Sequence, residues 1–201
     1  PMTTVEMSWY QMFMIRPHGI VKKNKDSIVI IDDSIVRGTT LEKSILTLLS
    51  SLEAKKVIFV SSSPQIRYPD CYGIDMSKMN QFVAFRGLMR LIKLNKKDKL
   101  IQETYLKCKK SLSEKNPKNY VKDLYHLFKY EEISDSIAEI VKPEGFKSEL
   151  KIIYQKIENL NKACPNNLGD WYFTGNYPTE GGNKVANLSL IHISEPTRRK
   201  H

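Results

Sequence analysis

Two neighbouring carboxylates, Asp32 and Asp33, stand between an apolar run and a turn rich in hydroxyl groups. Carboxylate oxygens can coordinate hydrated Mg²⁺ or accept hydrogen bonds from sugar hydroxyls. The turn covers residues 34–40, and a helical pattern begins at Leu41. Unpaired backbone N–H groups and the dipole at a helix N-terminus attract phosphate. These residue types in this order therefore predict a site for a phosphorylated sugar.

A strand, a helix and a second strand must position these residues. The apolar run before the carboxylates suits a buried parallel strand. Apolar residues from Leu41 to Leu52 recur at helical spacing, and Thr39 or Thr40 could cap that helix through its hydroxyl. Residues 57–61 form a second apolar run, which completes a βαβ unit with a right-handed crossover. Open α/β sheets bind ligands outside the carboxyl ends of their strands, where the acidic pair is expected.

The stretch Val29–Thr40 (VIIDDSIVRGTT) resembles the loop that binds phosphoribosyl pyrophosphate (PRPP) in type I phosphoribosyltransferases. Its form is similar to that of one branch of the family, the glutamine PRPP amidotransferases. Two further segments, 64–76 and 173–179, resemble the same branch. The resemblance covers about residues 19–187 and implies the C-terminal part of such an enzyme.

The resemblance implies an enzyme that transfers glutamine-derived ammonia to PRPP and yields 5-phosphoribosylamine, glutamate and pyrophosphate, the first step of de novo purine biosynthesis. It assigns PRPP binding to Asp32, Asp33, Ser34, Ile35, Val36, Arg37, Gly38, Thr39 and Thr40. It also assigns Mg²⁺ to Asp32 and Asp33, and a phosphate contact to Arg37. The N-terminal glutaminase domain of such enzymes has no counterpart in this chain. We therefore expect an inactive fragment without catalytic residues of its own, from an enzyme that forms a homo-oligomer.

Two other functions fit the same loop. One is a stand-alone phosphoribosyltransferase of nucleotide salvage, and the other is a non-catalytic regulator that binds PRPP. The formal net charge of +10 would suit nucleic acid. However, the lysines are scattered along helical segments without interleaved aromatic residues, so we expect no nucleic-acid partner. No apolar run approaches the roughly 20 residues of a membrane span, so we expect no membrane partner.

The cysteines bear on cofactor and compartment. Some members of the resembled branch hold an iron–sulfur cluster through a Cys-x-x-Cys pair, at positions that match Gly169 and Tyr172 here, while Cys71 is one residue out of register. A cluster needs four thiolates and the chain has 3 cysteines, so no cluster is expected. Reduced thiols and the lack of a signal-peptide pattern predict a cytoplasmic protein.

The whole chain is predicted to be α/β: a Rossmann-like parallel-sheet remnant of a phosphoribosyltransferase, followed by a helical extension. Four regions are expected: 1–18, unassigned and open to a non-native origin; 19–95, the C-terminal half of the phosphoribosyltransferase domain; 96–187, helical; and 188–201, which resembles a translated sequencing adapter and is interpreted as an artefact. Beyond the βαβ unit, helices are expected near 77–94, 98–112, 117–129, 131–141 and 146–162, with a loop over 163–186.

Overall fold

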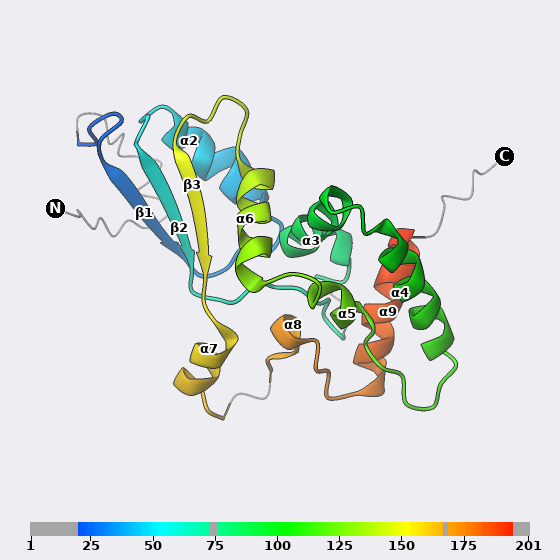
Figure 1. Cartoon of the computed structure of the whole chain (residues 1–201). Coiled ribbons are helices and arrows are strands. Elements are labelled where there is room, and N and C mark those ends of the chain that lie inside the picture. The colour runs from blue at the N-terminus through cyan, green and yellow to red at the C-terminus, as the bar shows by residue number, and fades with distance from the viewer. Residues whose placement is uncertain (1–19, 73–75, 167–168, 195–201) are drawn as a thin grey trace.

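The computed structural model describes residues 20–72, 76–166 and 169–194. Figure 1 shows a parallel sheet in the order β1–β2–β3 at one end of the molecule and a group of helices at the other. The elements are β1 (Ser27–Asp32), η1 (Leu41–Leu46), α2 (Thr47–Ser50), β2 (Lys56–Ser61), η2 (Met79–Gln81), α3 (Val83–Leu94), α4 (Asp98–Ser111), α5 (Val121–Tyr125), α6 (Tyr130–Val141), β3 (Glu149–Tyr154), α7 (Ile157–Ala163), α8 (Trp171–Thr174) and α9 (Glu180–Ser194). The predictions for residues 1–18 and 195–201 lie outside the described residues.

The predicted βαβ unit is confirmed. Strands β1 and β2 pair in parallel from Ser27 opposite Lys56 to Asp32 opposite Ser61, and η1 and α2 connect them. Of the two threonines predicted to cap this helix, Thr40 does not do so, because it already has helical backbone angles (φ −65°, ψ −42°) and makes no side-chain cap hydrogen bond; the alternative, Thr39, stays a prediction. An N-cap side chain reaches its N–H partners from a non-helical backbone, which this threonine does not have.

Residues 149–154 form the third strand, where a helix over 146–162 was predicted. Strand β3 pairs in parallel with β2, and its burial alternates: Ile152 and Tyr154 are buried whereas Lys151 and Ile153 are exposed. An ion pair between Lys56 Nζ and Glu149 Oε1 (2.7 Å) lies at the start of this register. The apolar spacing of this segment suits a helix as well as a strand, and the exposed edge of β2 decides in favour of the strand. The region 96–187 therefore also contributes to the sheet.

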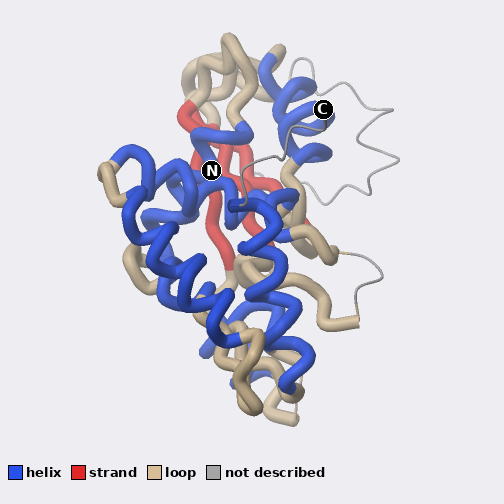
Figure 2. Tube along the Cα trace, turned by 90° about the vertical axis from the view of Figure 1, so that its right-hand side faces the viewer, coloured by secondary structure: helices blue, strands red, loops and turns tan. Residues whose placement is uncertain are grey.

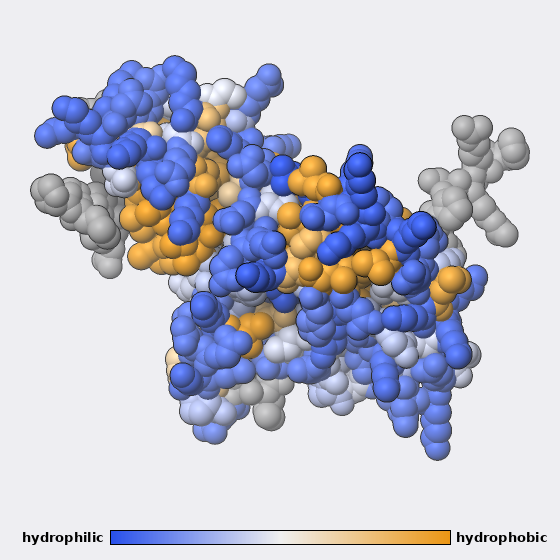
Figure 3. Space-filling model, viewed as in Figure 1, coloured by the Kyte–Doolittle hydropathy of each residue, from blue (hydrophilic) through white to orange (hydrophobic). Residues whose placement is uncertain are grey.

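One face of the sheet is buried and the other is open within the described residues. Val57, Phe59 and Ser61 of β2 are buried beneath helices that lie on one side of the strands in Figure 1. On the opposite face, Ile31 is 68% exposed and Ile153 is 41% exposed. Figure 3 shows hydrophobic surface over the strands. An apolar open face is unusual, because parallel sheets are normally covered on both sides.

The helices share one hydrophobic core with the covered face of the sheet. Helix α3 packs closely on α6, where a Cβ added to Gly87 would lie 2.9 Å from Ile137 Cγ1, and the Ser136 hydroxyl donates to the Gly87 carbonyl (2.9 Å). Helix α4 packs on α9 (Figures 1 and 2). The helices predicted near 98–112 and 131–141 are confirmed as α4 and α6.

Three of the predicted boundaries differ from the structure. The segment 117–129 contains only the short α5, and the helix expected from residue 77 begins as α3 at Val83, after the short η2. The predicted loop over 163–186 contains α8 and the start of α9. Glycines at 181 and 182 disfavour a helix in isolation, but Tyr177 packs directly against Gly182, where no side chain would fit. This local contact therefore allows α9 to start earlier than helix propensity predicts.

The region interpreted as an artefact overlaps helix α9. Its residues 188–194 continue the helix, and Leu190 and Ile191 are buried. This packing does not test the origin of the segment, so its interpretation as an artefact stays a prediction. No helix among the described residues is long and apolar enough to span a membrane.

Candidate phosphate-binding site

A pocket of about 370 Å³ opens at the carboxyl end of β1, which is the place predicted for the ligand. It is lined by Asp32, Ser34, Ile35, Val36, Arg37, Gly38, Thr39, Thr40, Leu41 and Met76. All of the predicted PRPP-binding residues except Asp33 therefore surround one cavity. Its size suits a small phosphorylated ligand.

The loop around this pocket is anchored to the core at several points. The side chain of Ile35 is buried, and the Val36 carbonyl accepts a hydrogen bond from the Val83 N–H at the start of α3 (2.8 Å). The carbonyls of Asp32 and Asp33 accept hydrogen bonds from the N–H groups of residues 62 and 63 (2.8 and 2.9 Å). A loop held in this way is pre-organised for a ligand, which lowers the ordering cost of binding.

Gly38 lies where the backbone of the loop turns sharply. Its φ of +73° lies in the left-handed region that glycine adopts without strain. A Cβ added here would lie 3.0 Å from Val141 Cγ1 and 3.1 Å from Val83 Cγ2. The resemblance assigned Gly38 to PRPP binding, and the structure adds that the lack of a side chain here lets the loop pack against α3 and α6.

The two aspartates differ in their surroundings. Partial burial raises the pKa of the Asp32 carboxyl above its usual range; the negative charge of Asp33 adds to the rise, whereas a hydrogen bond from the Asp33 backbone opposes it. Asp33 does not line the pocket, and its Oδ1 accepts a hydrogen bond from the Ser34 N–H (2.6 Å). The two carboxylates therefore favour a cation close to Asp32, which would relieve the unfavourable burial of its charge.

This donor set fits Mg²⁺ bound together with a substrate. Among the described residues there is no cluster of three or more His, Cys, Asp or Glu side chains that could enclose a metal by itself. Mg²⁺ usually binds through one or two carboxylates, substrate phosphate oxygens and water, and Asp32 and Asp33 can supply that protein share.

Met76 reaches the pocket from a different part of the chain, after strand β2. Its φ of +48° is uncommon for a residue with a side chain. Sequence analysis did not assign Met76 to the site. The signal that could have found it was the resemblance of segment 64–76 to the same family as the loop.

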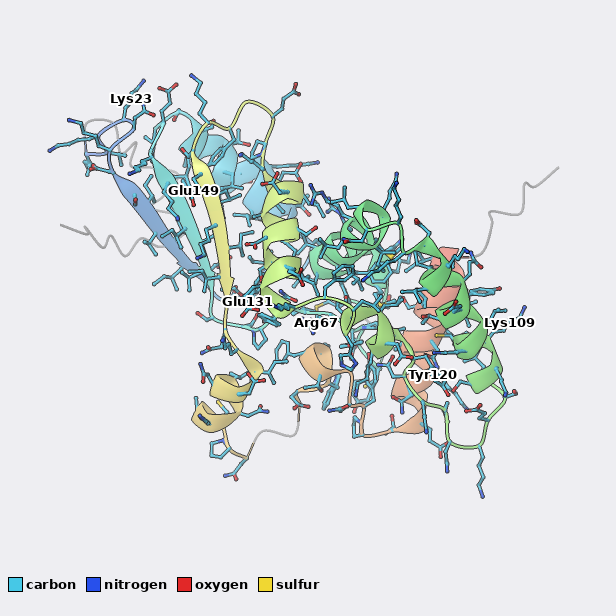
Figure 4. All side chains as sticks on the ribbon, viewed as in Figure 1. Lys23, Arg67, Lys109, Tyr120, Glu131 and Glu149 are labelled. Carbon is cyan, nitrogen blue, oxygen red and sulfur yellow. The ribbon has the colours of Figure 1, made fainter. Side chains whose placement is uncertain are left out.

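The segments that carry the resemblance meet in space. The Tyr172 carbonyl accepts hydrogen bonds from the N–H groups of Arg67 and Tyr68 (2.9 and 3.1 Å). The Tyr177 hydroxyl donates to the Pro69 carbonyl (2.6 Å). Figure 4 shows Arg67 where this segment passes the end of α6 and helix α5; its guanidinium stacks on the rings of Tyr125 and Tyr130, with 4.9 Å to each ring centroid. The C-terminal segment thus supports the loop that carries Met76.

Two of the residues discussed for an iron–sulfur cluster, Tyr172 and Cys71, lie next to Asp70. The Tyr172 hydroxyl donates to Asp70 Oδ1 (3.2 Å), and the neighbouring Cys71 thiol is half-buried. Burial, followed by the charge of Asp70, raises the pKa of the Cys71 thiol. A cluster needs four thiolates, whereas Gly169 and Tyr172 offer none at the two matching positions. These residues do not fit a thiolate-bound cluster.

The parallel sheet, with a pocket at the carboxyl end of β1, places the chain among the α/β proteins, which bind ligands at that edge of the sheet. No protein-family model matches the chain. The amidophosphoribosyltransferase of Pasteurella multocida is 41% identical over 100 residues, which are 49% of this chain and 20% of the relative. The Saccharomyces cerevisiae enzyme is 28% identical over 156 residues, 76% of this chain and 20% of the relative. The Schizosaccharomyces pombe enzyme is 25% identical over 192 residues, 93% of this chain and 26% of the relative.

These similarities confirm the predicted resemblance and the predicted α/β fold class. The chain is a relative of the amidophosphoribosyltransferases and carries part of a phosphoribosyltransferase fold. It spans about a fifth to a quarter of the length of these curated relatives.

Proposed function

We propose that the chain contributes the PRPP-binding loop of an amidophosphoribosyltransferase, the enzyme that transfers glutamine-derived ammonia to PRPP. The observation that carries this proposal is the pocket at the carboxyl end of β1, lined by Asp32 and the loop 34–40. The names and identities of the relatives support it.

In this proposal the loop binds the 5′-phosphate through backbone N–H groups and the hydroxyls of Ser34, Thr39 and Thr40. Asp32 and Asp33 hold the ribose hydroxyls and Mg²⁺. When bound, Mg²⁺ neutralises charge that develops on departing pyrophosphate. The chain's own contribution to the displacement at the anomeric carbon is to orient the sugar, a role for which the anchored loop is suited.

The chain by itself is proposed to bind the ligand without turnover, because the described pocket supplies a phosphate loop and an acidic edge but no source of ammonia. The complete enzyme is proposed to contain a glutaminase domain and to form a homo-oligomer. We propose a cytoplasmic location, which the free thiols of Cys71, Cys108 and Cys164 support. We propose no iron–sulfur cluster, since the chain has 3 cysteines and such a cluster needs four thiolates.

Isothermal titration of the chain with PRPP, with and without Mg²⁺, tests the binding proposal. We expect saturable binding that Mg²⁺ strengthens and that Asp32→Asn removes. The matched control is Asp135→Asn, which neutralises an exposed aspartate of α6 and should leave binding unchanged. Absence of PRPP binding by the unsubstituted chain would refute the proposed site.

A second assay tests the absence of turnover. The chain is mixed with PRPP, Mg²⁺ and ammonia, and pyrophosphate release is followed. We expect no release above the rate without protein. Release that depends on both the chain and ammonia would show that this segment is catalytically complete, contrary to the proposal.

A further inference from the structure

Met76 stands out among the pocket residues because of its origin and its backbone. It comes from the segment after β2, whereas the other lining residues belong to the continuous stretch 32–41. It holds a left-handed φ of +48°, which residues with a side chain rarely adopt. Such conformations persist only where surrounding contacts impose them, and they are frequent at ligand sites.

Asp70 provides one of the contacts that hold Met76. The Asp70 N–H donates to the Met76 carbonyl (3.0 Å), and Met76 also packs against the hydrophobic core. Asp70 is only 9% exposed, and its Oδ1 accepts hydrogen bonds from the Tyr72 N–H (3.2 Å) and from the Tyr172 hydroxyl (3.2 Å). A chain of contacts therefore runs from helix α8 through Asp70 to the wall of the pocket.

We propose that Met76 is a specificity-determining contact residue of the phosphate pocket and that Asp70 is its positioning residue. The inference rests on the proposed function and adds the ligand class that the wall selects. The loop offers N–H groups and hydroxyls to a phosphate, whereas Met76 offers an uncharged thioether side chain to whatever extends from that phosphate. A pentose presents C–H surface that such a side chain can cover. The pocket should therefore distinguish a sugar phosphate from inorganic phosphate through Met76.

The test compares ribose 5-phosphate with inorganic phosphate as titrants of the same variants. Met76→Gly removes the side chain and also relieves the left-handed backbone, so we expect an unchanged or higher midpoint of thermal unfolding. Affinity for ribose 5-phosphate should fall about fivefold, the effect of losing part of one apolar contact. Affinity for inorganic phosphate should stay the same. Equal effects on both titrants, or no effect on either, overturn the role of Met76.

Lys96→Gly is the matched control. Lys96 also has a side chain on a left-handed backbone (φ +53°), but it lies between α3 and α4 and does not line the pocket. The substitution should relieve the same backbone strain and leave both affinities unchanged. If Lys96→Gly weakens ribose 5-phosphate binding as much as Met76→Gly does, the effect is not a wall contact and the inference is overturned.

A double-mutant cycle tests whether Asp70 acts through Met76. Asp70→Asn alone should weaken ribose 5-phosphate binding about twofold to fivefold, because a neutral amide oxygen accepts the hydrogen bonds of Tyr72 and Tyr172 more weakly than a carboxylate and so loosens the wall. In the Met76→Gly background the same change should have no further effect on affinity. Effects that multiply in the double variant overturn the positioning role. Tyr172→Phe removes one hydrogen bond to Asp70, should show the same dependence on Met76, and replaces Asp70→Asn if that variant does not fold.

The outcomes separate this inference from the proposed function. If the unsubstituted chain binds neither titrant, the proposed site and this inference both fail. If it binds ribose 5-phosphate and Met76→Gly changes nothing, the proposed function stands and this inference alone fails.

Discussion

Replacing Gly38 by alanine tests how the ligand loop is attached to the core. The new Cβ would have to adopt a left-handed φ of +73° and would lie 3.0 Å from Val141 Cγ1 and 3.1 Å from Val83 Cγ2. The backbone strain costs about 1 kcal/mol. The crowding of two valine side chains in a packed core adds about 1–2 kcal/mol. We therefore expect Gly38→Ala to lower the free energy of unfolding by about 2–3 kcal/mol.

Gly145→Ala separates the two contributions. Gly145 has nearly the same backbone angle (φ +76°), but no atom lies within 4 Å of its added Cβ. This substitution should cost only the strain, about 1 kcal/mol. Urea unfolding of the two variants measures the difference, provided that the slope of the transition is unchanged.

A second readout connects the packing to the site. Because Gly38 lies in the pocket wall, relief of the crowding must displace the loop, and affinity for inorganic phosphate should fall in Gly38→Ala but not in Gly145→Ala. Equal costs of the two substitutions would refute the packing of the loop against α3 and α6. A large cost with unchanged phosphate affinity would refute the link between that packing and the pocket.

Other expectations follow from burial and charge. The pKa of the Asp32 carboxyl is raised in the folded chain, so folding favours its protonated form. The contribution of this carboxyl to stability therefore declines as the pH rises through the raised pKa. Asp32→Asn should accordingly not lower the free energy of unfolding at pH 7, as measured by urea unfolding. PRPP binding, followed by titration calorimetry, should weaken as the pH falls toward the raised pKa, before an ordinary aspartate would protonate. Phe59→Ala should lower the free energy of unfolding in urea by about 3–5 kcal/mol, because Phe59 is fully buried. Ile31→Thr on the open face should change it by no more than about 0.5 kcal/mol. A large loss of stability at Ile31 would mean that another surface covers that face. A thiol reagent should modify the exposed Cys164 rapidly in the native protein. It should modify Cys108 only after denaturation, because Cys108 is buried and its burial raises the pKa of the thiol to about 12. Rapid labelling of both cysteines in the native protein would contradict this burial.

Much of the ligand loop could be predicted because its information is local. The acidic pair, the hydroxyl-rich turn and the following helix are consecutive in the chain, so their pattern predicts both their conformation and their chemistry. The pairing of β1 with β2 followed for the same reason, since a helix between two apolar runs allows few topologies.

Strand β3 was mispredicted because its partner is distant in sequence. The spacing of apolar residues in 146–162 suits a helix, and only the edge of β2 favours a strand there. The start of α9 at Glu180 was missed for a different, local reason: the nearby Tyr177 packs on Gly182, and this contact outweighs the low helix propensity of glycine.

The same distinction between local and distant contacts applies to the candidate site. Residue types and their spacing are enough to predict the nature of the ligand loop, because carboxylates, hydroxyls and one glycine at these spacings are local features. The folded loop then shows that Asp33 turns to the Ser34 N–H while Asp32 lines the pocket, and the packing of the whole chain brings Met76 to the pocket wall. Met76 is placed by Asp70 and, through it, by Tyr172 of α8. Contacts between segments so far apart depend on how the whole chain packs, and no local pattern of residues encodes them.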